Sequence, residues 1–534
     1  MSSSSLRDAK YLLHPPRRQQ PDYGSHNNND DSEESSSSMD DDDDEEAKAT
    51  LLRRQDNFTI GYDVQKGYRG TELKLSSFRR PHMRAFHGSW CCFFASFFTQ
   101  FAMAPLLPVM EQSLQLTKSQ VWQGNLAMMI GGIPMRLLIG PMVEKHGGKG
   151  AMTTILALSG IVCGLSGVVV TNATSLSITR FLIGAMDTFV PCQFWITCLF
   201  VREVAATAMA IAGGLGSVGS ACTQIVLGTA IFPLIAYALN GDEDLAWRLT
   251  LIFPALLSIS TAWVFAKFSD DCPLGNFQEV KKAGLMVERS AMDSFRSGAL
   301  NINSWLLFLQ FAFSCGVDFT MSNGAAMYYH KRFNQPVSIV GALAFLYGIS
   351  ALYARAVGGY LSDVMSESLS LRGRLLAQFL SMALQGLLNV WFARMDELGH
   401  SVTMLVFFSI MVQISMGTCF GIVPYIDGPN IGSVAGIVAA GGNVGGAMCS
   451  LLFMYYDYDW AMELMGWLTV ASSFLTFFIV VKGFRGLVFG TEDEEGSSTK
   501  QQHSPLVVPG KMQHSPHLVA YRRRQRKNAW RPRS

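Results

Sequence analysis

The feature that most constrains this chain is a series of long apolar runs, separated by short polar segments. About twelve such runs lie near 86–110, 121–143, 150–170, 175–200, 205–233, 246–267, 303–328, 337–362, 374–394, 401–424, 430–455 and 459–482. A bilayer core about 30 Å thick requires about 20 apolar residues in a helix. Because lipid offers the backbone no hydrogen-bond partners, each run is predicted to be a membrane-spanning helix. The sequence therefore predicts an all-α membrane protein with about twelve spans.

Composition supports this prediction, since 49% of the residues are hydrophobic and only 16% are charged. Soluble chains carry about 25% charged residues. The charges gather near the two termini and in short stretches between the runs, so the net charge of +1 says nothing about partners. Nothing in the sequence indicates a nucleic-acid partner, and the bilayer itself is the first partner expected.

The polar segments divide the chain into five parts. We predict a disordered cytoplasmic tail at 1–84, a six-helix half at 85–267, a cytoplasmic loop at 268–302, a second six-helix half at 303–483 and a cytoplasmic tail at 484–534. The tails are too polar, and the first too rich in Ser, Asn and Asp, to build a packed core.

Basic residues between the spans set the expected orientation, because they favour the cytoplasmic side. With a cytoplasmic N-terminus, the basic residues of the inner loops are Lys145, Lys149, Arg202, Lys281, Lys282, Arg289, Arg296, Arg372 and Arg374. Only Lys118, Lys331 and Arg332 lie clearly on the outer side. An even number of spans then places both tails in the cytoplasm.

The two halves repeat each other. Arg136, with Gly at +4 and an acid at +8, matches Arg355 at an offset of 219 residues. The stretch Gly-Ser-Val-Gly at 216–219 matches Gly-Asn-Val-Gly at 442–445 at an offset of 226 residues. Two six-span halves in parallel repeat are typical of major facilitator transporters, whose substrate site lies between the halves near the membrane midplane.

Arg136 and Arg355 each interrupt an apolar run near its middle. A charge at that depth costs at least about 2.5 kcal/mol, so each arginine is expected to face the protein interior. One explanation is a structural ion pair, but no acid lies within the same helical turn of either residue. We therefore predict that the two arginines bind a small anion, because a guanidinium offers two parallel donors to a planar oxyanion.

Glycines gather in the fifth and eleventh runs. Small residues allow close approach of helices, which predicts tight packing where the two clusters lie. The cluster residues are Gly214, Gly216, Gly219, Gly441, Gly442 and Gly445. Within them, Asn443 and its counterpart Ser217 are candidate donors to the anion.

Two acids inside the runs, Asp318 and Asp187, are candidate proton carriers, because a desolvated carboxylate can titrate within a membrane. A hydrogen-bonded structural acid is the alternative for each. Arg180, at the start of the fourth run, is predicted to be structural. The sequence contains no phosphate-binding loop, no nucleophile–base pair and no cluster with metal-ligand spacing, so we expect neither an enzyme nor a metal or other cofactor.

The segment after the second run, with Gly140, Glu144, Gly147 and Lys149, resembles the loop between the second and third spans of major facilitators. The resemblance implies a gating role, in which the acid pairs with charges on neighbouring helices.

A wider resemblance covers about residues 86 to 455. The motifs that carry it are Phe86-His87-x-Ser89-Trp90, Ala104-Pro105-Leu106-Leu107-Pro108, Cys192-Gln193-Phe194-Trp195, Thr223-Gln224, Ala354-Arg355, Gly358-Gly359, Arg372-Gly373-Arg374, Gly421-Ile422-Val423-Pro424 and Ala440-Gly441-Gly442-Asn443-Val444-Gly445. Together they are similar to the eukaryotic high-affinity nitrate transporters, in the nitrate/nitrite porter branch of the major facilitators.

The resemblance implies proton-coupled symport of nitrate, with nitrite as a second substrate. It places Arg136 and Arg355 on the family's nitrate-binding arginines and Phe194 among the substrate-binding residues. The family's signature in the fifth span has Trp and Asn where this chain has Leu215 and Ser217. A nitrite or other small-anion porter, and a nitrate sensor with little flux, are therefore alternatives.

Location and accessory partners follow from the same resemblance. The plasma membrane is expected, with a vacuolar membrane as the alternative. Many relatives work with a small single-span accessory subunit, which is a candidate partner here.

Overall fold

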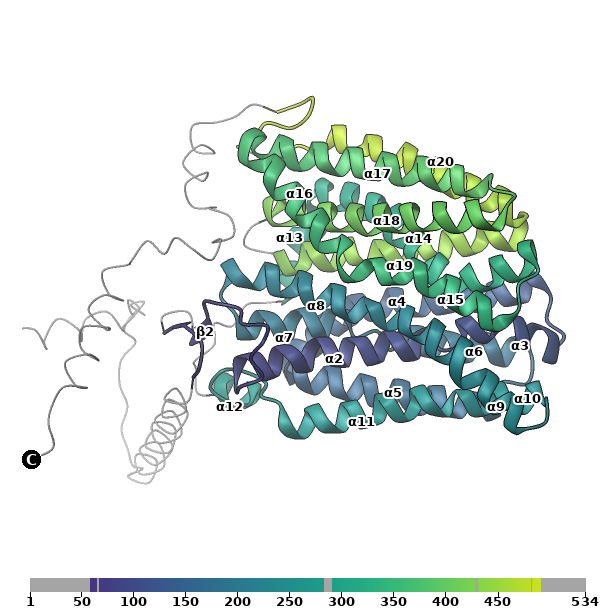
Figure 1. The fold of residues 1–534 in the computed structure, drawn as a ribbon. Helices are drawn as coiled ribbons and strands as arrows, with labels where there is room; N and C mark the ends of the chain where they lie inside the picture. Colours follow the sequence, from purple (N-terminus) through teal and green to yellow (C-terminus); the bar gives the residue numbers. More distant parts are fainter. Residues whose placement is uncertain (1–57, 65–66, 283–290, 428–430, 482, 491–534) are drawn as a thin grey trace, which may run out of the picture. The chain divides into compact units, whose positions relative to one another are not determined.

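A computed structural model describes residues 58–64, 67–282, 291–427, 431–481 and 483–490 of the chain, and nearly all of their regular structure is helical (Figure 1). These residues belong to one compact unit, which covers 51–534. Most of the predicted terminal tails, 1–57 and 491–534, lies outside the described residues.

The described end of the predicted N-terminal tail is folded rather than disordered. Strands β1 (Tyr62–Asp63) and β2 (Arg69–Gly70) form an antiparallel hairpin. The Ile60 side chain is buried, and the Gly70 carbonyl accepts a hydrogen bond from the Val201 N–H at 3.0 Å. One buried apolar side chain and this backbone pairing attach the segment to the helical body.

The first half of the chain forms six crossings, several of them built from two or three helical segments. The segments are α2 (His82–Gln100), η3 (Ala104–Leu106), α3 (Leu107–Ser113), α4 (Lys118–His146), α5 (Gly148–Val169), α6 (Ala173–Ala185), α7 (Phe189–Leu199), α8 (Arg202–Thr223), the π-helix η4 (Gln224–Ile231), α9 (Phe232–Ala238), α10 (Glu243–Thr250) and α11 (Ile252–Phe268).

Two short helices, α12 (Phe277–Lys282) and α13 (Ala291–Leu300), lie in the connection to the second half. The second half again makes six crossings. Its segments are α14 (Ile302–Phe333), α15 (Val337–Gly348), η5 (Ile349–Leu352), α16 (Ala354–Leu369), α17 (Leu371–Ala393), α18 (Leu398–Ile426), α19 (Ile431–Tyr455), α20 (Tyr458–Ser473) and η7 (Phe474–Phe478).

Eleven helical segments among the described residues are long and apolar enough to cross a membrane. The remaining predicted run, 121–143, is helix α4, whose 29 residues are also long enough to cross a bilayer. Its apolar character is interrupted by Asn125 and Arg136. The all-α membrane fold predicted from the sequence is confirmed.

Successive crossings run in opposite directions, so the bundle has two ends. We call the end where α2 begins and α4 finishes the near end, and the end where α4 begins the far end. Figure 1 shows α12, α13 and β2 at the near end and α3, α9 and α10 at the far end. The near end is the cytoplasmic side in the orientation predicted from loop charge.

The glycine clusters lie where helices pack most closely. A Cβ atom added to Gly219 of α8 would lie 2.2 Å from the Phe94 carbonyl oxygen of α2. One added to Gly445 of α19 would clash in the same way with the Ala312 carbonyl of α14. These contacts make any larger side chain at either glycine incompatible with the observed packing.

Three neighbouring glycines make the same kind of contact. Added Cβ atoms would clash with the Phe93 ring at Gly216, the Phe308 carbonyl at Gly441 and the Cys315 sulfur at Gly442. Gly214 faces the opposite half instead, because the Ala351 carbonyl of η5 would lie 3.2 Å from its Cβ.

Candidate functional site

Arg136 is buried at the centre of the bundle, in α4. Its Nε donates to Asp187 Oδ2 at 2.6 Å, and its Nη1 donates to the main-chain carbonyl of Ala439 in α19. The rings of Phe189 and Phe319 lie on the guanidinium, each with its centroid 5.6 Å from Cζ. The Arg136 and Asp187 side chains are only 4% and 3% exposed, so this ion pair is desolvated.

Asp187 lies where the fourth crossing is interrupted between α6 and α7. Its second oxygen, Oδ1, accepts a hydrogen bond from the Phe189 N–H at 2.7 Å and so binds the first turn of α7. Non-helical backbone at membrane depth is tolerated where it lines a protein interior. Asp187 therefore has two roles. Its Oδ1 atom fixes the start of α7, and its Oδ2 atom pairs with Arg136.

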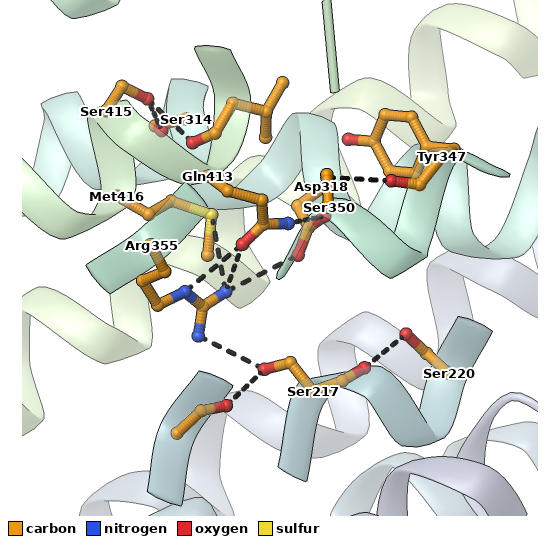
Figure 2. A network of polar contacts seen from close by, with 12 residues as sticks. Ser217, Ser220, Ser314, Asp318, Tyr347, Ser350, Arg355, Gln413, Ser415 and Met416 are labelled. Carbon is orange, nitrogen blue, oxygen red and sulfur yellow. Dashed lines mark hydrogen bonds and ion pairs between the residues drawn. The ribbon is translucent and has the colours of Figure 1, made fainter. Parts of the chain in front are cut away.

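Arg355 occupies the equivalent position in the second half, in the first turn of α16 (Figure 2). Its Nε and Nη2 donate to Gln413 Oε1 at 3.2 and 2.9 Å, and its Nη1 donates to Ser217 Oγ at 3.1 Å. Asp318 Oδ2 lies 3.9 Å from Nη2. Gln413 bridges the two groups, because its Nε2 donates to Asp318 Oδ1 at 2.8 Å.

Each arginine reaches across to the other half of the molecule. Arg136 of the first half binds Ala439 of α19, and Arg355 of the second half binds Ser217 of α8. The pattern follows the internal repeat, since α8 and α19 are the two repeat-related helices. The two arginines therefore hold equivalent, crosswise positions at the interface between the halves.

No acid lies within the same helical turn of either arginine, as the sequence shows, but each arginine has an acid beside it in the fold. The partners come from other helices: Asp187 lies 51 residues after Arg136, and Asp318 lies on α14. With both acids ionised, the four side chains sum to zero charge. The structure thus brings the predicted anion site and the predicted proton carriers together into one cluster.

Asn443 lies beside this cluster, on α19. Gly132, one turn before Arg136 on α4, gives it room, because a Cβ there would clash with the Asn443 amide nitrogen. Asn443 is 4% exposed, and its side chain makes no hydrogen bond to any described residue. Ser217, its counterpart, donates to the Gly213 carbonyl at 2.8 Å and accepts from Arg355.

Phe194 lies away from the arginines. Its ring packs on Phe277 of α12, with centroids 5.7 Å apart, at the near end. The aromatic side chains at Arg136 are Phe189 and Phe319, which the sequence reasoning missed. It also missed Gln413, although a glutamine inside an apolar run was a signal, and its offset from Asp187 is again 226 residues.

The near-end loop places Gly147 and Lys149 against the connection that follows α11. Gly147 has φ +85°, and a Cβ there would lie 2.5 Å from Asp271 Oδ2. Asp271 accepts from the Lys149 N–H at 3.1 Å and the Phe277 N–H at 3.2 Å. Burial raises the pKa of Asp271, while the Lys149 N–H and ammonium act in the opposite direction.

Gly140 and Glu144 belong to α4, but the surroundings of both lie outside the described residues. The predicted pairing of Glu144 in the gating loop therefore stays a prediction. Among the residues that the structure does describe, no group of three His, Cys, Asp or Glu side chains could hold a metal ion.

The halves are joined at the far end by side chains from both. Trp122 of α4 stacks on Phe453 of α19 with centroids 4.4 Å apart, and Lys118 donates to the Tyr456 carbonyl at 2.6 Å. These contacts close the far end of the interface between α4 and α19.

A second set of far-end contacts involves α14. Lys331 forms an ion pair with Glu111 at 2.7 Å, and Gln224 Nε2 donates to the Ser322 carbonyl at 2.7 Å. Both contacts join the first half to the second. The far end is therefore closed in this structure.

Solved structures of known transporters share this architecture. A bacterial homologue of the human lysosomal transporter Spinster superposes with a TM-score of 0.54 at 14% identity, covering 74% of this chain and 94% of that one. The nucleoside transporter NupG superposes with a TM-score of 0.52 at 13% identity, covering 73% and 98%. This likeness shows the fold, which is that of a multi-pass helical membrane protein with twelve crossings in two repeated halves.

Sequence comparison identifies the family. Residues 89–450 match the model of the Major Facilitator Superfamily. High affinity nitrate transporter 2.7 of Arabidopsis thaliana is 31% identical, covering 83% of this chain and 96% of the relative. Nitrate transporter 2.1 of Chlamydomonas reinhardtii is 32% identical, covering 75% of each chain. The chain belongs to the Major Facilitator Superfamily and, within it, to the eukaryotic high-affinity nitrate transporters.

Proposed function

We propose that this protein transports nitrate across a membrane as a proton-coupled symporter, by alternating access around Arg136 and Arg355. The observation that carries the proposal is the crosswise pair of arginines at the interface between the halves, Arg136 buried and Arg355 partly buried, each with an acid beside it. Its relatives are nitrate transporters, which supports nitrate as the substrate.

Charge balance links the anion to the proton. Two guanidinium groups and two carboxylates sum to zero, so nitrate adds one uncompensated negative charge to a buried cluster. An unpaired charge in a desolvated site costs several kcal/mol. A proton taken up by Asp187 or Asp318 with the anion removes that cost, and return of both to bulk water restores the resting pairs.

The geometry also suits a planar oxyanion. The Arg355 Nη1 faces Ser217, and the Asn443 amide lies next to α4 one turn from Arg136. Nitrate can exchange with the weakly held partners, such as Asp318 at 3.9 Å from Arg355, more readily than with Asp187 at 2.6 Å. We therefore infer that nitrate displaces the partners of Arg355 before it displaces Asp187 from Arg136.

The experiment is nitrate uptake into proteoliposomes that contain the purified protein, with and without an imposed proton gradient. We expect the gradient to drive accumulation. Arg136→Lys and Arg355→Lys are each expected to lose most transport, because lysine lacks the two-donor fork. Arg394→Lys, at an arginine with 59% side-chain exposure, is the matched control and is expected to transport normally.

Two outcomes contradict the proposal. Normal nitrate affinity in both central arginine variants would show that these residues do not bind the anion. Nitrate binding without uptake by the wild-type protein would favour a sensor.

Nitrite is the second candidate substrate. Nitrate/nitrite transporter NrtP of Nostoc punctiforme is 22% identical, covering 82% of this chain and 99% of the relative. The short Ser217 side chain gives Arg355 a hydroxyl where the family signature provides an amide. Competition between labelled nitrate and nitrite in the same vesicles separates the two, since uptake of nitrite alone would replace nitrate as the substrate.

A further inference from the structure

A third arginine inside the helical bundle, Arg180, has no role in the site described above. It lies on α6 and is 1% exposed. Its Nη1 donates to Asn323 Oδ1 of α14 at 2.9 Å and contacts Met128 Sδ of α4 at 3.2 Å. Because α14 belongs to the second half, Arg180 also lies at the interface between the halves.

The charge of Arg180 has no ion-pair partner among the residues that the structure describes. No described carboxylate lies within ion-pair distance of it, and its Nε and Nη2 have no hydrogen-bond acceptor. Arg136 and Arg355, by contrast, each have an acid. Burial of a charge without a partner is strongly unfavourable, so a purely structural role explains Arg180 poorly.

The two unpaired donors form one edge of the guanidinium. Nε–H and Nη2–H point in the same direction and are the two parallel donors that bind two oxygens of a planar oxyanion. The Asn323 contact uses the other nitrogen, Nη1, and leaves this edge available. The free edge therefore matches the chemistry of the proposed substrate.

A neighbouring side chain is also unsatisfied. Asn125 of α4 is 1% exposed, and neither its Oδ1 nor its Nδ2 has a hydrogen-bond partner among the described residues. It lies within one turn of Gly124 and Met128, the two α4 residues that Arg180 approaches. Two buried polar side chains with unused hydrogen-bonding groups thus come from the region in which α4 and α6 pack together.

Arg180 lies on the far side of the central site. Its partner Asn323 is five residues beyond Asp318 along α14, which corresponds to about 7.5 Å of helix in the direction of the far end. An anion that enters from the far end therefore meets Arg180 before it meets Arg136.

We propose that the Nε–Nη2 edge of Arg180 is a far-end anion site, which binds a small planar oxyanion before it reaches Arg136 and Arg355. This inference rests on the proposed function. The site is covered while the far-end contacts are closed and becomes accessible when α14 separates from α6. Arg180 then supplies the uncompensated positive charge that draws the anion into the interface.

The test compares nitrate uptake by Arg180→Gln and Asn323→Ala in the full-length protein in proteoliposomes. Removal of the charge is expected to raise the KM for nitrate by about tenfold or more, with the saturated rate changed far less. Asn323→Ala keeps the charge of Arg180 and removes the Nη1 contact together with the Asn323 Nδ2 hydrogen bond to the Phe319 carbonyl, so its KM is expected to stay near that of the wild type. Arg180→Lys, which keeps the charge without the fork, is expected to lie between the two.

Equal increases in KM for Arg180→Gln and Asn323→Ala would show that Arg180 acts only through its structural contact with Asn323, and this would overturn the inference. A wild-type KM in Arg180→Gln would do the same while leaving the proposed function intact. Failure of the wild-type protein to move nitrate would overturn the proposed function first. If Arg180→Gln does not fold, the comparison is made with Arg180→Lys. The far-end site predicts an increased KM for Arg180→Lys and a KM near the wild type for Asn323→Ala. A purely structural contact between Arg180 and Asn323 predicts the same increase for both.

Discussion

Asp318 offers the most direct test of proton coupling, through the change Asp318→Asn. Asparagine has nearly the same shape, and its oxygen can still accept the hydrogen bond from Gln413 Nε2, now 2.8 Å long. Its amide replaces the Oδ2 atom that lies 3.9 Å from Arg355 Nη2. The variant therefore removes one charge from the central cluster and leaves the packing in place.

The effect of Asp318→Asn on nitrate affinity follows from the 3.9 Å between Asp318 Oδ2 and Arg355 Nη2. Two unit charges about 4 Å apart interact by about 4 kcal/mol at an effective dielectric constant of about 20. The Arg355 and Asp318 side chains keep 15% and 10% exposure, and Gln413 already binds both. We therefore take about 1–2 kcal/mol as the gain for an anion at Arg355, a factor of about 5–30 in affinity.

The assay has two parts, nitrate binding by titration calorimetry and nitrate uptake with and without a pH gradient. Asp318→Asn should bind nitrate more tightly and should no longer accumulate it in response to the gradient. Asp363→Asn is the matched control, because it removes an acid 2.6 Å from Arg374 at the near end. Proton-driven uptake and affinity equal to the wild type would refute the reasoning and leave Asp187 as the candidate carrier.

Ser217→Asn replaces the hydroxyl, which lies 3.1 Å from Arg355 Nη1, by a longer amide. We expect the preference for nitrate over nitrite, measured in a competition assay, to increase severalfold. Glu111→Gln removes the partner of Lys331 from an ion pair whose side chains are 11% and 41% exposed. Because partly exposed pairs contribute about 1 kcal/mol, labelling of a cysteine introduced at the far end should accelerate by about fivefold. Burial raises the pKa of Asp271, so the folded protein keeps a proton that the unfolded chain has already lost. Stability should therefore fall as pH rises from the ordinary aspartate pKa to the raised one, and be flat above it; thermal unfolding in detergent should lose this slope in Asp271→Asn.

The spans and the two halves could be predicted from the sequence because they depend on local properties. Apolar length identifies each helix, and the repeat that relates Arg136 to Arg355 is visible as spacing alone. The ion pair between Arg136 and Asp187 depends on how two helices pack, which no local spacing encodes. The sequence placed both residues in the membrane but not beside each other.

Phe194 is assigned to the site by resemblance to the family, and the structure places Phe189 at Arg136 instead. Both residues lie in α7, five positions apart, and therefore point about 140° apart around the helix. Which of them reaches Arg136 depends on how α7 packs against α4, which the sequence alone does not encode. The folded segment at 58–70 was missed for another reason, because its attachment depends on a few tertiary contacts, such as those of Ile60, Gly70 and Tyr68, rather than on composition.

The crosswise reach of the arginines also ties the order of events to the motion of the halves. A rigid rotation that separates α4 from α19 lengthens the Arg136–Ala439 contact, and one that separates α16 from α8 lengthens the Arg355–Ser217 contact. Each half therefore carries one donor that loses its acceptor as the interface opens. In the proposed transport cycle, these two donors would become free for the anion when the halves separate, and the bound anion would occupy them until the halves close again.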